Sequence, residues 1–411
     1  MPAKRSDLRS SVFADWILPI AGPPLEGGTI TVDSERIVSV ERGRQAGAEA
    51  IGGPSVVLPA LVNAHTHLEL SYLRGRIPRA ARFTDWVTPL LAARQTPPEP
   101  DHVTSEAAAA VGQAHVSGTG LFGDVSNSFG AVPALRAARR PARVFHELLG
   151  FNVPEPESRV AEARGRVEAI ARESSGDDLR FSLAPHAPYS VSPALFAALR
   201  QDASRHGGIT TVHLAESGEE VQLLADGSGP WRALLERIGV WTDAWQPPAC
   251  SPVAYLQRRG FLDAATLVVH GVQCTPDDIA RLAHIGATLV SCPRSNAYVG
   301  AGIPPLSAFY DAGVPVAFGT DSLASVEDLN LFSELALARR IAPSVPARRL
   351  LESATATGAR ALGFGDDYGT IEPGKRAALI SVRLPPHVRD VEEYLVSGIQ
   401  AADVAWVFAH E

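Results

Sequence analysis

The stretch VVLPALVNAHTHLEL at residues 56–70 is an apolar run that ends in two histidines, His65 and His67. On a β-strand, residues two positions apart project to the same side, so these two imidazoles can bind one metal ion together. Two polar residues at the surface end of a strand would give the same pattern, because a motif this short often arises without function. The other strands of the chain therefore decide between the two interpretations.

Residues 56–322 alternate short apolar runs with longer stretches of helical periodicity. This alternation is typical of βα units around a parallel sheet. Eight such units predict an α/β fold with a (β/α)8 TIM-like barrel, whose active site lies at the carboxyl ends of the strands. The predicted strands are VVLPALVNAHTH, TGLFGDVS, RVFHELLG, RFSLAPHAP, TTVHLAES, TLVVHG, TLVSCPRSN and VPVAFGTDS. The predicted helices are residues 101–117, 131–140, 157–174, 193–206, 217–226, 275–285, 304–312, 327–340 and 346–362.

The two flanks of this region have a different pattern, with strand-like segments such as GTITVDSERIVSV before it and GTIEPGKRAALISV after it. Alternation of apolar and polar residues, divided by turns, predicts strands. We expect the flanks to pair with one another in a small β-sandwich domain built from both chain ends. The predicted division is residues 1–57 and 365–411 for this domain and residues 58–364 for the barrel.

The composition argues against several classes of protein. The 411 residues carry a net charge of −8, whereas nucleic acids are bound by clustered positive charge. No apolar stretch approaches the roughly 20 residues of a membrane helix. The three cysteines lack CxxC spacing, which fits neither a disulfide framework nor a cysteine zinc site. We therefore expect a cytoplasmic enzyme with a small-molecule substrate and no nucleic-acid or membrane partner, and we leave a homo-oligomer open.

Several other predicted strands end in residues that bind metals. His213 and Glu216 lie in HLAE of the fifth strand. His270 ends the sixth strand, and Asp321 lies in GTDS at the end of the eighth. One such histidine is most often a hydrogen-bonded core residue, but several strands that deliver such residues to one face favour a shared site. Three imidazoles and a carboxylate suit Zn²⁺ or Fe²⁺ better than Mg²⁺ or Ca²⁺, which prefer oxygen ligands.

The set NAHTH, HLAE, VVHG and GTDS, in this order and spacing, resembles the amidohydrolase superfamily. The resemblance is closest to its cytosine deaminase-like branch of amino-purine, nucleoside and chloro-triazine hydrolases, and it extends to the closing motif GTIEPGKRAALI. It implies hydrolysis of a C–N bond by deamination, with one divalent transition metal, Zn²⁺ first and Fe²⁺ as the alternative. The implied metal ligands are His65, His67, His213 and Asp321.

The same resemblance implies catalytic roles for Glu216, His270 and Asp321. Glu216 lies three residues beyond His213, where a strand that bends into a loop can bring its carboxylate beside the metal-bound water as a proton shuttle. His270 and Asp321 would orient this water and take its proton. The structural alternatives are an ion pair of Glu216 with an arginine such as Arg232, and a supporting hydrogen bond from His270.

The expected number of metal ions depends on whether a lysine lies where it could bridge two of them. Binuclear members of the superfamily commonly bridge two ions with a carbamylated lysine on the fourth strand, but Lys4 and Lys375 are the only lysines and neither lies in the predicted barrel. We therefore expect a mononuclear site. Glu147 in RVFHELLG is the residue that could instead bridge two ions.

Predictions for substrate binding rest on five residues. The segment PHAPY resembles one that carries a substrate-facing histidine in the family, and RG and SCPRSN resemble other family segments. The acidic segment of methylthioadenosine and S-adenosylhomocysteine deaminases is replaced here by RIPRAARFTDW, whereas LELS and FHELLG look more like deaminases of 6-amino-6-deoxyfutalosine. That adenine-type nucleoside is our best single prediction for the substrate. The predicted substrate-binding residues are His186, Glu69, Arg74, Glu147 and Asn296.

Two other functions remain open. One is another hydrolysis at the same site, such as dechlorination of a triazine or opening of a cyclic amide. The other is a barrel that binds a metal or ligand without turnover, which a proton shuttle beside the ligands disfavours. The Trp-rich segment 229–259 is longer than a simple crossover and is interpreted as a lid, an oligomer contact or packing.

Overall fold

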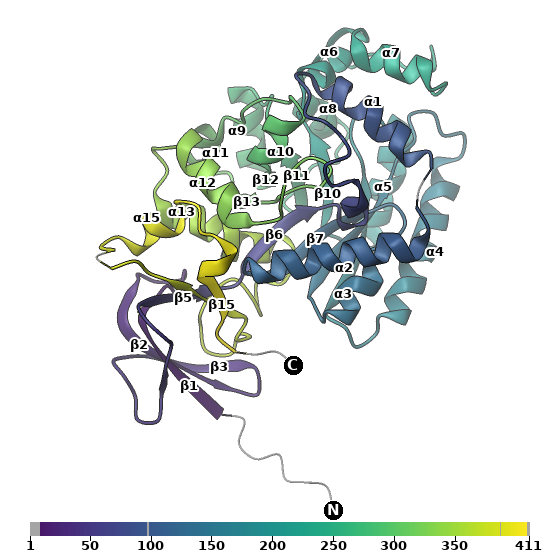
Figure 1. Cartoon of the computed structure of the whole chain (residues 1–411). Helices are drawn as coiled ribbons and strands as arrows, with labels where there is room; N and C mark the ends of the chain where they lie inside the picture. Colours follow the sequence, from purple (N-terminus) through teal and green to yellow (C-terminus); the bar gives the residue numbers. More distant parts are fainter. Residues whose placement is uncertain (1–8, 97, 387, 409–411) are drawn as a thin grey trace, which may run out of the picture.

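The computed structural model describes residues 9–96, 98–386 and 388–408. It has two four-stranded parallel sheets surrounded by helices, and a third sheet to one side of them (Figure 1). In both parallel sheets the strands follow one another in chain order. The first sheet holds β6 (Leu61–Thr66), β7 (Thr119–Ser126), β8 (Ala142–Leu148) and β9 (Leu179–Pro185). The second holds β10 (Thr210–Leu214), β11 (Thr266–His270), β12 (Thr288–Ser291) and β13 (Val316–Phe318).

Hydrogen bonds also join the edges of the two parallel sheets. Beyond β9 the backbone N–H of His213 donates to the carbonyl of His186 over 2.9 Å, and beyond β13 the N–H of Asp321 donates to the carbonyl of His65 over 3.0 Å. The second contact needs Gly319, because a Cβ at this position would lie 2.7 Å from Cβ of His65. A side chain at residue 319 would therefore separate β13 from β6, and with it the two strand ends that carry His65 and Asp321.

The helices between the strands follow the predicted pattern at most positions, and their apolar faces pack on the sheets. Proline occupies one of the first two positions of α2, α4 and α5, where its missing N–H costs no helical hydrogen bond. The long helices are α2 (Pro100–Val116), α4 (Pro156–Glu173), α5 (Pro193–His206), α9 (Pro276–Ile285) and α12 (Leu331–Ile341). The shorter ones are η1 (Leu68–Leu73), α3 (Val132–Ala137), α6 (Gly218–Asp226), α8 (Pro252–Arg258), α10 (Pro293–Tyr298), α11 (Leu306–Asp311), α13 (Ala347–Glu352), η2 (Ser353–Thr357), α14 (Gly358–Ala361), α15 (Val391–Leu395) and η3 (Ala401–Asp403).

Several helices were not predicted, namely η1, α1, α7, α8, α10, α15 and η3, and α1 and α7 are the longest of them. Helix α1 (Phe83–Arg94) contains Pro89 in its interior. Its N-cap residue is Arg82, whose side chain makes no capping hydrogen bond. Proline in the interior of a helix normally breaks it, so this stretch has no clear helical signal in the sequence. Helix α7 (Pro230–Arg237) lies in the Trp-rich segment that we interpreted as an insertion. The two helices lie next to each other at one end of the molecule (Figure 1).

The prediction of one continuous strand over residues 56–67 is wrong. The run is divided into β5 (Ser55–Pro59) and β6, which belong to different sheets. The backbone N–H of Ala60 donates to the carbonyl of Ala378, while that of Leu61 donates to the carbonyl of Gly118. The chain therefore passes from one sheet to the other at Ala60. Because both strands are buried on both faces, the apolar run has no interruption that would reveal the crossing.

The third sheet is built from strands of both flanks. It has seven strands, in the order β15-β14-β5-β1-β2-β3, with β4 paired to β1, and they form one hydrogen-bonded sheet. Antiparallel pairing of β14 with β5 joins the two flanks, and the purple and yellow strands therefore meet in Figure 1. The bounds are β1 (Arg9–Ile17), β2 (Leu25–Asp33), β3 (Arg36–Arg42), β4 (Glu49–Ala50), β14 (Leu379–Arg383) and β15 (Val404–Trp406). Residues 1–8 and 409–411 of the predicted β-domain lie outside the described residues.

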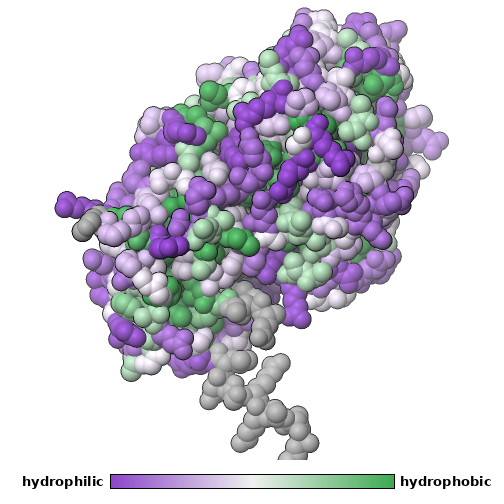
Figure 2. Space-filling view, in the orientation of Figure 1, coloured by the Kyte–Doolittle hydropathy of each residue, from purple (hydrophilic) through white to green (hydrophobic). Residues whose placement is uncertain are grey.

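The surface in Figure 2 is mainly hydrophilic, with small groups of hydrophobic residues between the charged ones. Over the described part of the chain, no helix has both the length and the apolar character needed to cross a bilayer. The three cysteines are free thiols, as expected.

Candidate functional site

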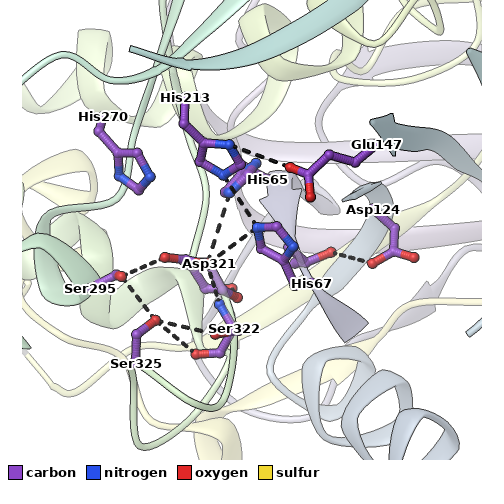
Figure 3. A network of polar contacts seen from close by, with 12 residues as sticks. His65, His67, Asp124, Glu147, His213, His270, Ser295, Asp321, Ser322 and Ser325 are labelled. Atoms are coloured by element: carbon purple, nitrogen blue, oxygen red, sulfur yellow. Dashed lines mark hydrogen bonds and ion pairs between the residues drawn. The ribbon is translucent and has the colours of Figure 1, made fainter. Parts of the chain in front are cut away.

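Side chains from the ends of β6, β10 and β13 converge at one point (Figure 3). The Nε2 atoms of His67 and His213 are 3.3 Å apart. Oδ1 of Asp321 lies 3.9 Å from Nε2 of His65 and 3.7 Å from Nε2 of His67. These three imidazoles and this carboxylate are the predicted metal ligands, and the structure brings all four together.

The geometry of these donors fits a metal ion. Ligand nitrogens about 2.0–2.1 Å from a tetrahedral Zn²⁺ lie about 3.3 Å from one another, which is the separation of His67 and His213. Among the described residues, Nε2 of His65 has no hydrogen-bond partner although the side chain is buried. Burial lowers the pKa of His65 and of His213 well below the usual range. Both imidazoles are therefore neutral and can offer a lone pair to a metal.

Hydrogen bonds outside the cluster orient its members. Nδ1 of His213 lies 3.1 Å from the carbonyl of His186, which fixes the ring so that Nε2 faces the cluster. Ser295 donates to Oδ2 of Asp321 over 2.6 Å, and the N–H of Ser322 donates to Oδ1 over 2.7 Å. Asp124 accepts a bond from the N–H of Leu68 and so fixes the segment that carries His67.

Two strand-end residues of the site have left-handed backbone conformations. The φ angle is 77° at His270 and 63° at Asp321, a region that residues other than glycine rarely adopt. Such conformations persist where the surrounding structure holds them, and they are most frequent at functional sites. His270 is the last residue of β11, and Asp321 lies three residues beyond β13.

Glu216 and His270 lie beside the cluster. Nε2 of His270 is 3.4 Å from Oε1 of Glu216, and Nδ1 donates to Oδ1 of Asn296 over 2.8 Å. The bond to Asn296 leaves Nε2 of His270 as the unprotonated nitrogen, and burial lowers the pKa of His270 to about 4. Burial raises the pKa of Glu216 well above its usual range. The pair therefore combines a carboxyl group that holds its proton with an imidazole that can accept one.

These residues form the floor of a cavity, which we call the main cavity. Its floor consists of His67, His213, Glu216, His270 and Asp321. Its apolar wall is supplied by α1 and α7, with the side chains Phe83, Trp86, Val87, Leu90, Trp231, Leu234 and Leu235. The ring of Tyr189, another lining residue, stacks on that of Trp231 with 4.0 Å between centroids. The floor can support acid–base chemistry, and the wall can bind a flat apolar ring.

Two of the five predicted substrate-binding residues line the main cavity, namely His186 and Glu147. Nδ1 of His186 lies 2.6 Å from Oγ of Ser190, which leaves Nε2 available. Oε1 of Glu147 lies 3.6 Å from Nδ1 of His213 and has no hydrogen-bond partner among the described residues. Glu147, His186 and His213 also form a group that could hold a metal, so the bridging role of Glu147 stays an alternative to a mononuclear site. The side chain of Lys375 donates to the carbonyl of Gly365, and this lysine belongs to neither of the two parallel sheets. Lys4 lies outside the described residues.

Glu69, Arg74 and Asn296 do not line this cavity, and their roles in substrate binding stay predictions. The exposed Arg74 donates to Gln113. Asn296 is buried behind His270 and acts through it. Burial alone would raise the pKa of Glu69, but hydrogen bonds from Ser126, Asn127 and Ser128 lower it below the usual range.

Residues of the cavity that sequence reasoning missed come mostly from α1 and α7, and two more come from the segment after β9. Tyr189 in PHAPY donates to Oε2 of Glu216 over 3.3 Å, and Arg94 lines the cavity at the end of α1. The aromatic content of RFTDW and WRALLER was the available signal for the wall, because aromatic side chains gather at ligand pockets.

Comparison with known proteins identifies a family to which this chain is similar. A model described as "Amidohydrolase family" matches residues 56–407. An aminodeoxyfutalosine deaminase from Deinococcus radiodurans is 34% identical over 324 residues, which cover 75% of this chain and 74% of that protein. A 5-methylthioadenosine/S-adenosylhomocysteine deaminase from Moorella thermoacetica is 30% identical over 412 residues, with 96% of this chain and 91% of that protein covered.

Among solved structures, a zinc-bound adenosine deaminase from Xanthomonas campestris is similar with a TM-score of 0.81 and 26% identity. The match covers 96% of this chain and 90% of that chain. The similarity extends through both parallel sheets and the third sheet, so the relatives share the whole arrangement that carries the site. The resemblance stated from the motifs is thereby confirmed.

Proposed function

The chain belongs to the amidohydrolase family, whose members bind a divalent metal, and we propose that it hydrolytically deaminates an adenine-type nucleoside or amino-purine. Its relatives are deaminases, which are hydrolases acting on C–N bonds. The observation that carries the proposal is the convergence of His67, His213, Glu216, His270 and Asp321 at the floor of one cavity. His65 lies next to this floor, with its Nε2 3.9 Å from Oδ1 of Asp321. We also infer that the two parallel sheets close into a (β/α)8 barrel, as the bonds at both of their edges support, with domain boundaries near residues 58 and 364.

His65, His67, His213 and Asp321 would hold the metal, with Zn²⁺ as the best choice for this donor set. When bound, such an ion supplies a water molecule whose pKa falls from about 15.7 towards 7. We propose one ion per chain, because neither lysine can form a bridging carbamate at the site.

The chain's own residues then move the protons. Water attacks the ring carbon that bears the amino group, and Asp321 together with Nε2 of His270 accepts the proton that the water loses. Glu216, whose pKa burial raises, donates its proton to the ring nitrogen beside that carbon. As the C–N bond breaks, the amine takes up the proton held by Asp321 and His270 and leaves as ammonia, and the new hydroxyl group returns a proton to Glu216 as it becomes a carbonyl. Tyr189 and the backbone N–H of Glu216, which donates to Oε2 of Glu220, hold the shuttle in place.

For the substrate we propose aminodeoxyfutalosine. The deaminase of this compound from Deinococcus radiodurans is the relative with 34% identity. The aromatic wall formed by Phe83 and Trp231 suits a purine and an attached apolar group.

A screen of ammonia release tests this function on the metal-loaded protein. The substrates are adenosine, methylthioadenosine, S-adenosylhomocysteine, aminodeoxyfutalosine, guanine and cytosine, with chloride release from a chloro-triazine measured in parallel. We expect ammonia from at least one adenine-type nucleoside and the highest kcat/KM with aminodeoxyfutalosine. Chloride release without ammonia would favour the triazine alternative, and no turnover of any compound would favour a barrel that only binds.

A further inference from the structure

A single turn of helix α10 holds two groups of the floor in place. It carries Ser295 and Asn296, which are both fully buried. Ser295 donates to Oδ2 of Asp321 over 2.6 Å, and Figure 3 shows it bonded to both Asp321 and Ser325. Asn296 accepts a bond from Nδ1 of His270 over 2.8 Å. A shift of this turn would therefore change the orientation of a proposed metal ligand and of the proposed base together.

Helix α10 has no cap of its own. Its N-cap residue, Cys292, makes no side-chain hydrogen bond to the helix. The first N–H groups of a helix have no partner within it, and that of Arg294 donates to Oε2 of Glu334 over 3.0 Å. Glu334 lies on another helix, α12, and is fully buried. A carboxylate from α12 thus takes the place of a cap for α10.

Glu334 is not needed to cap its own helix. Oδ1 of Asn330 accepts a bond from the N–H of Phe332 over 3.0 Å, so α12 already has its N-cap. Among the described residues, Oε1 of Glu334 has no hydrogen-bond partner, and it lies 3.7 Å from Nη1 of Arg294. Burial of such a carboxylate is costly, and apolar side chains of similar volume often replace buried ion pairs without loss of stability. Stability alone therefore does not explain an acid at this position, whereas a role in placing α10 does.

The guanidinium of Arg294 joins the same turn to the loop that follows Asp321. It donates to the side chain and to the carbonyl of Asp328 over 2.8 and 3.3 Å, and it lies 3.3 Å from Oε2 of Glu327. Arg294 therefore keeps two carboxylate partners if Glu334 is replaced by a neutral side chain. Replacement of Glu334 thus changes the support of α10 without leaving an unpaired charge.

We propose that Glu334 is a positioning residue for the reaction, and that it acts by fixing the first turn of α10 through the N–H of Arg294. The turn then orients a proposed metal ligand through Ser295 and the imidazole of His270 through Asn296. This inference rests on the proposed function, in which the ligand binds the metal and the imidazole accepts a proton. Within the described part of the chain, the hydrogen bond and the ion pair of Glu334 are both with Arg294, so it contacts neither group directly.

The test changes Glu334 in three ways. Glu334→Gln keeps an oxygen that can accept the N–H of Arg294. Glu334→Met has a similar volume and no such acceptor, and Glu334→Asp keeps the charge but withdraws it from this N–H by one methylene. The control is Arg339→Gln, which removes a 2.9 Å ion pair with Glu393 from the last turn of α12. For each variant, competition with a chelator gives the metal affinity, turnover of an adenine-type nucleoside gives kcat and KM, and thermal unfolding gives the stability.

We expect Glu334→Met and Glu334→Asp to bind the metal about tenfold more weakly, at the lower end of the effect of a partner of a metal ligand, because Glu334 acts one contact further away. At saturating metal, kcat should fall by a similar factor while KM is unchanged. Glu334→Gln and Arg339→Gln should stay close to the wild type in metal affinity and kcat. Glu334→Met should unfold at a temperature close to that of the wild type, and Glu334→Asp carries the same comparison if the methionine variant does not fold.

A double-mutant cycle shows whether the effect passes through Ser295. Glu334→Met should weaken metal binding much less in a Ser295→Ala background than in the wild type, because changes within one network are not additive. Three results would each overturn the positioning role: unchanged metal affinity in Glu334→Met and Glu334→Asp, additive effects in the cycle, or an equal loss in Glu334→Gln and Glu334→Met. If no nucleoside releases ammonia, the proposed function fails, and the metal measurements, which need no substrate, still decide whether Glu334 positions the metal site.

Discussion

The floor and the apolar wall of the main cavity come from different kinds of chain segment. The floor residues stand at the ends of parallel strands, are buried, and are fixed by hydrogen bonds such as that from Ser295 to Asp321. The wall residues lie on α1 and α7, which come after β6 and β10 in the chain as additional helices. The two helices contact one another through the rings of Phe83 and Trp231. The difference teaches that the reaction is a property of the strand ends, while the choice of substrate is a property of the inserted helices. Changes in the floor should therefore affect metal and turnover, and changes in the wall should affect KM.

The largest effect is expected from removal of a metal ligand. His67→Ala should lose most of the bound metal and lower kcat by more than about a thousandfold, because a free water molecule keeps a pKa of about 15.7. Elemental analysis together with ammonia release measures both quantities. His67 is partly exposed, so circular dichroism should show an intact fold. Full metal content in this variant would remove His67 from the ligand set.

The next largest effect separates the shuttle from the metal. Glu216→Gln keeps the shape of the side chain and should retain about one metal per chain, but it should lower kcat by a factor on the order of 10²–10⁴, the usual contribution of general acid–base catalysis. Single-turnover kinetics with the metal-loaded variant measures this loss. Turnover at the wild-type rate in Glu216→Gln would mean that another group transfers the proton to the ring nitrogen.

A smaller effect is expected from the residue that orients Asp321. Ser295→Ala removes the 2.6 Å hydrogen bond to Oδ2 of Asp321 and should weaken metal affinity about 10- to 100-fold, as the loss of a partner of a metal ligand typically does. Competition with a chelator measures the affinity. The matched control is Ser291→Ala in β12, because its buried hydroxyl has no hydrogen-bond partner among the described residues. Equal metal affinity in the two variants would show that the bond to Asp321 is unimportant.

The smallest effect concerns the wall. Trp231→Phe weakens the stacking on Tyr189 and should raise KM for a purine nucleoside about 2- to 10-fold with little change in kcat, in line with the energy of an aromatic pair. Trp241→Phe is the control, since Trp241 stacks on Phe151 outside the main cavity. A fall in kcat with unchanged KM for Trp231→Phe would mean that floor and wall are not separable.

The floor was predictable from the sequence and the wall was not, for a physical reason. Parallel strands place their last residues at a common edge, so the sequence could predict that His67, His213 and Asp321 lie close together. No such rule applied to helix α1, because Pro89 removes the helical signal from its sequence and its position against the parallel sheets depends on tertiary packing.

The position of Glu69, which does not line the main cavity, shows the same limit. Glu69 follows His67 by two positions, and a continued strand would point both side chains into the site. The chain instead turns into η1, and the carboxylate of Glu69 accepts bonds from the N–H groups of Asn127 and Ser128. These partners lie in a distant loop, so no local pattern in the sequence reveals them.

The position of β5 between β1 and β14 affects how the chain is made. During translation, residues 9–59 leave the ribosome long before residues 379–383. The edge of β5 that later pairs with β14 therefore stays open while all the strands of the two parallel sheets are synthesised. An apolar strand with an open edge readily pairs with another chain. A protein truncated before residue 379 should therefore aggregate rather than merely lose activity, although every residue of the floor would be present.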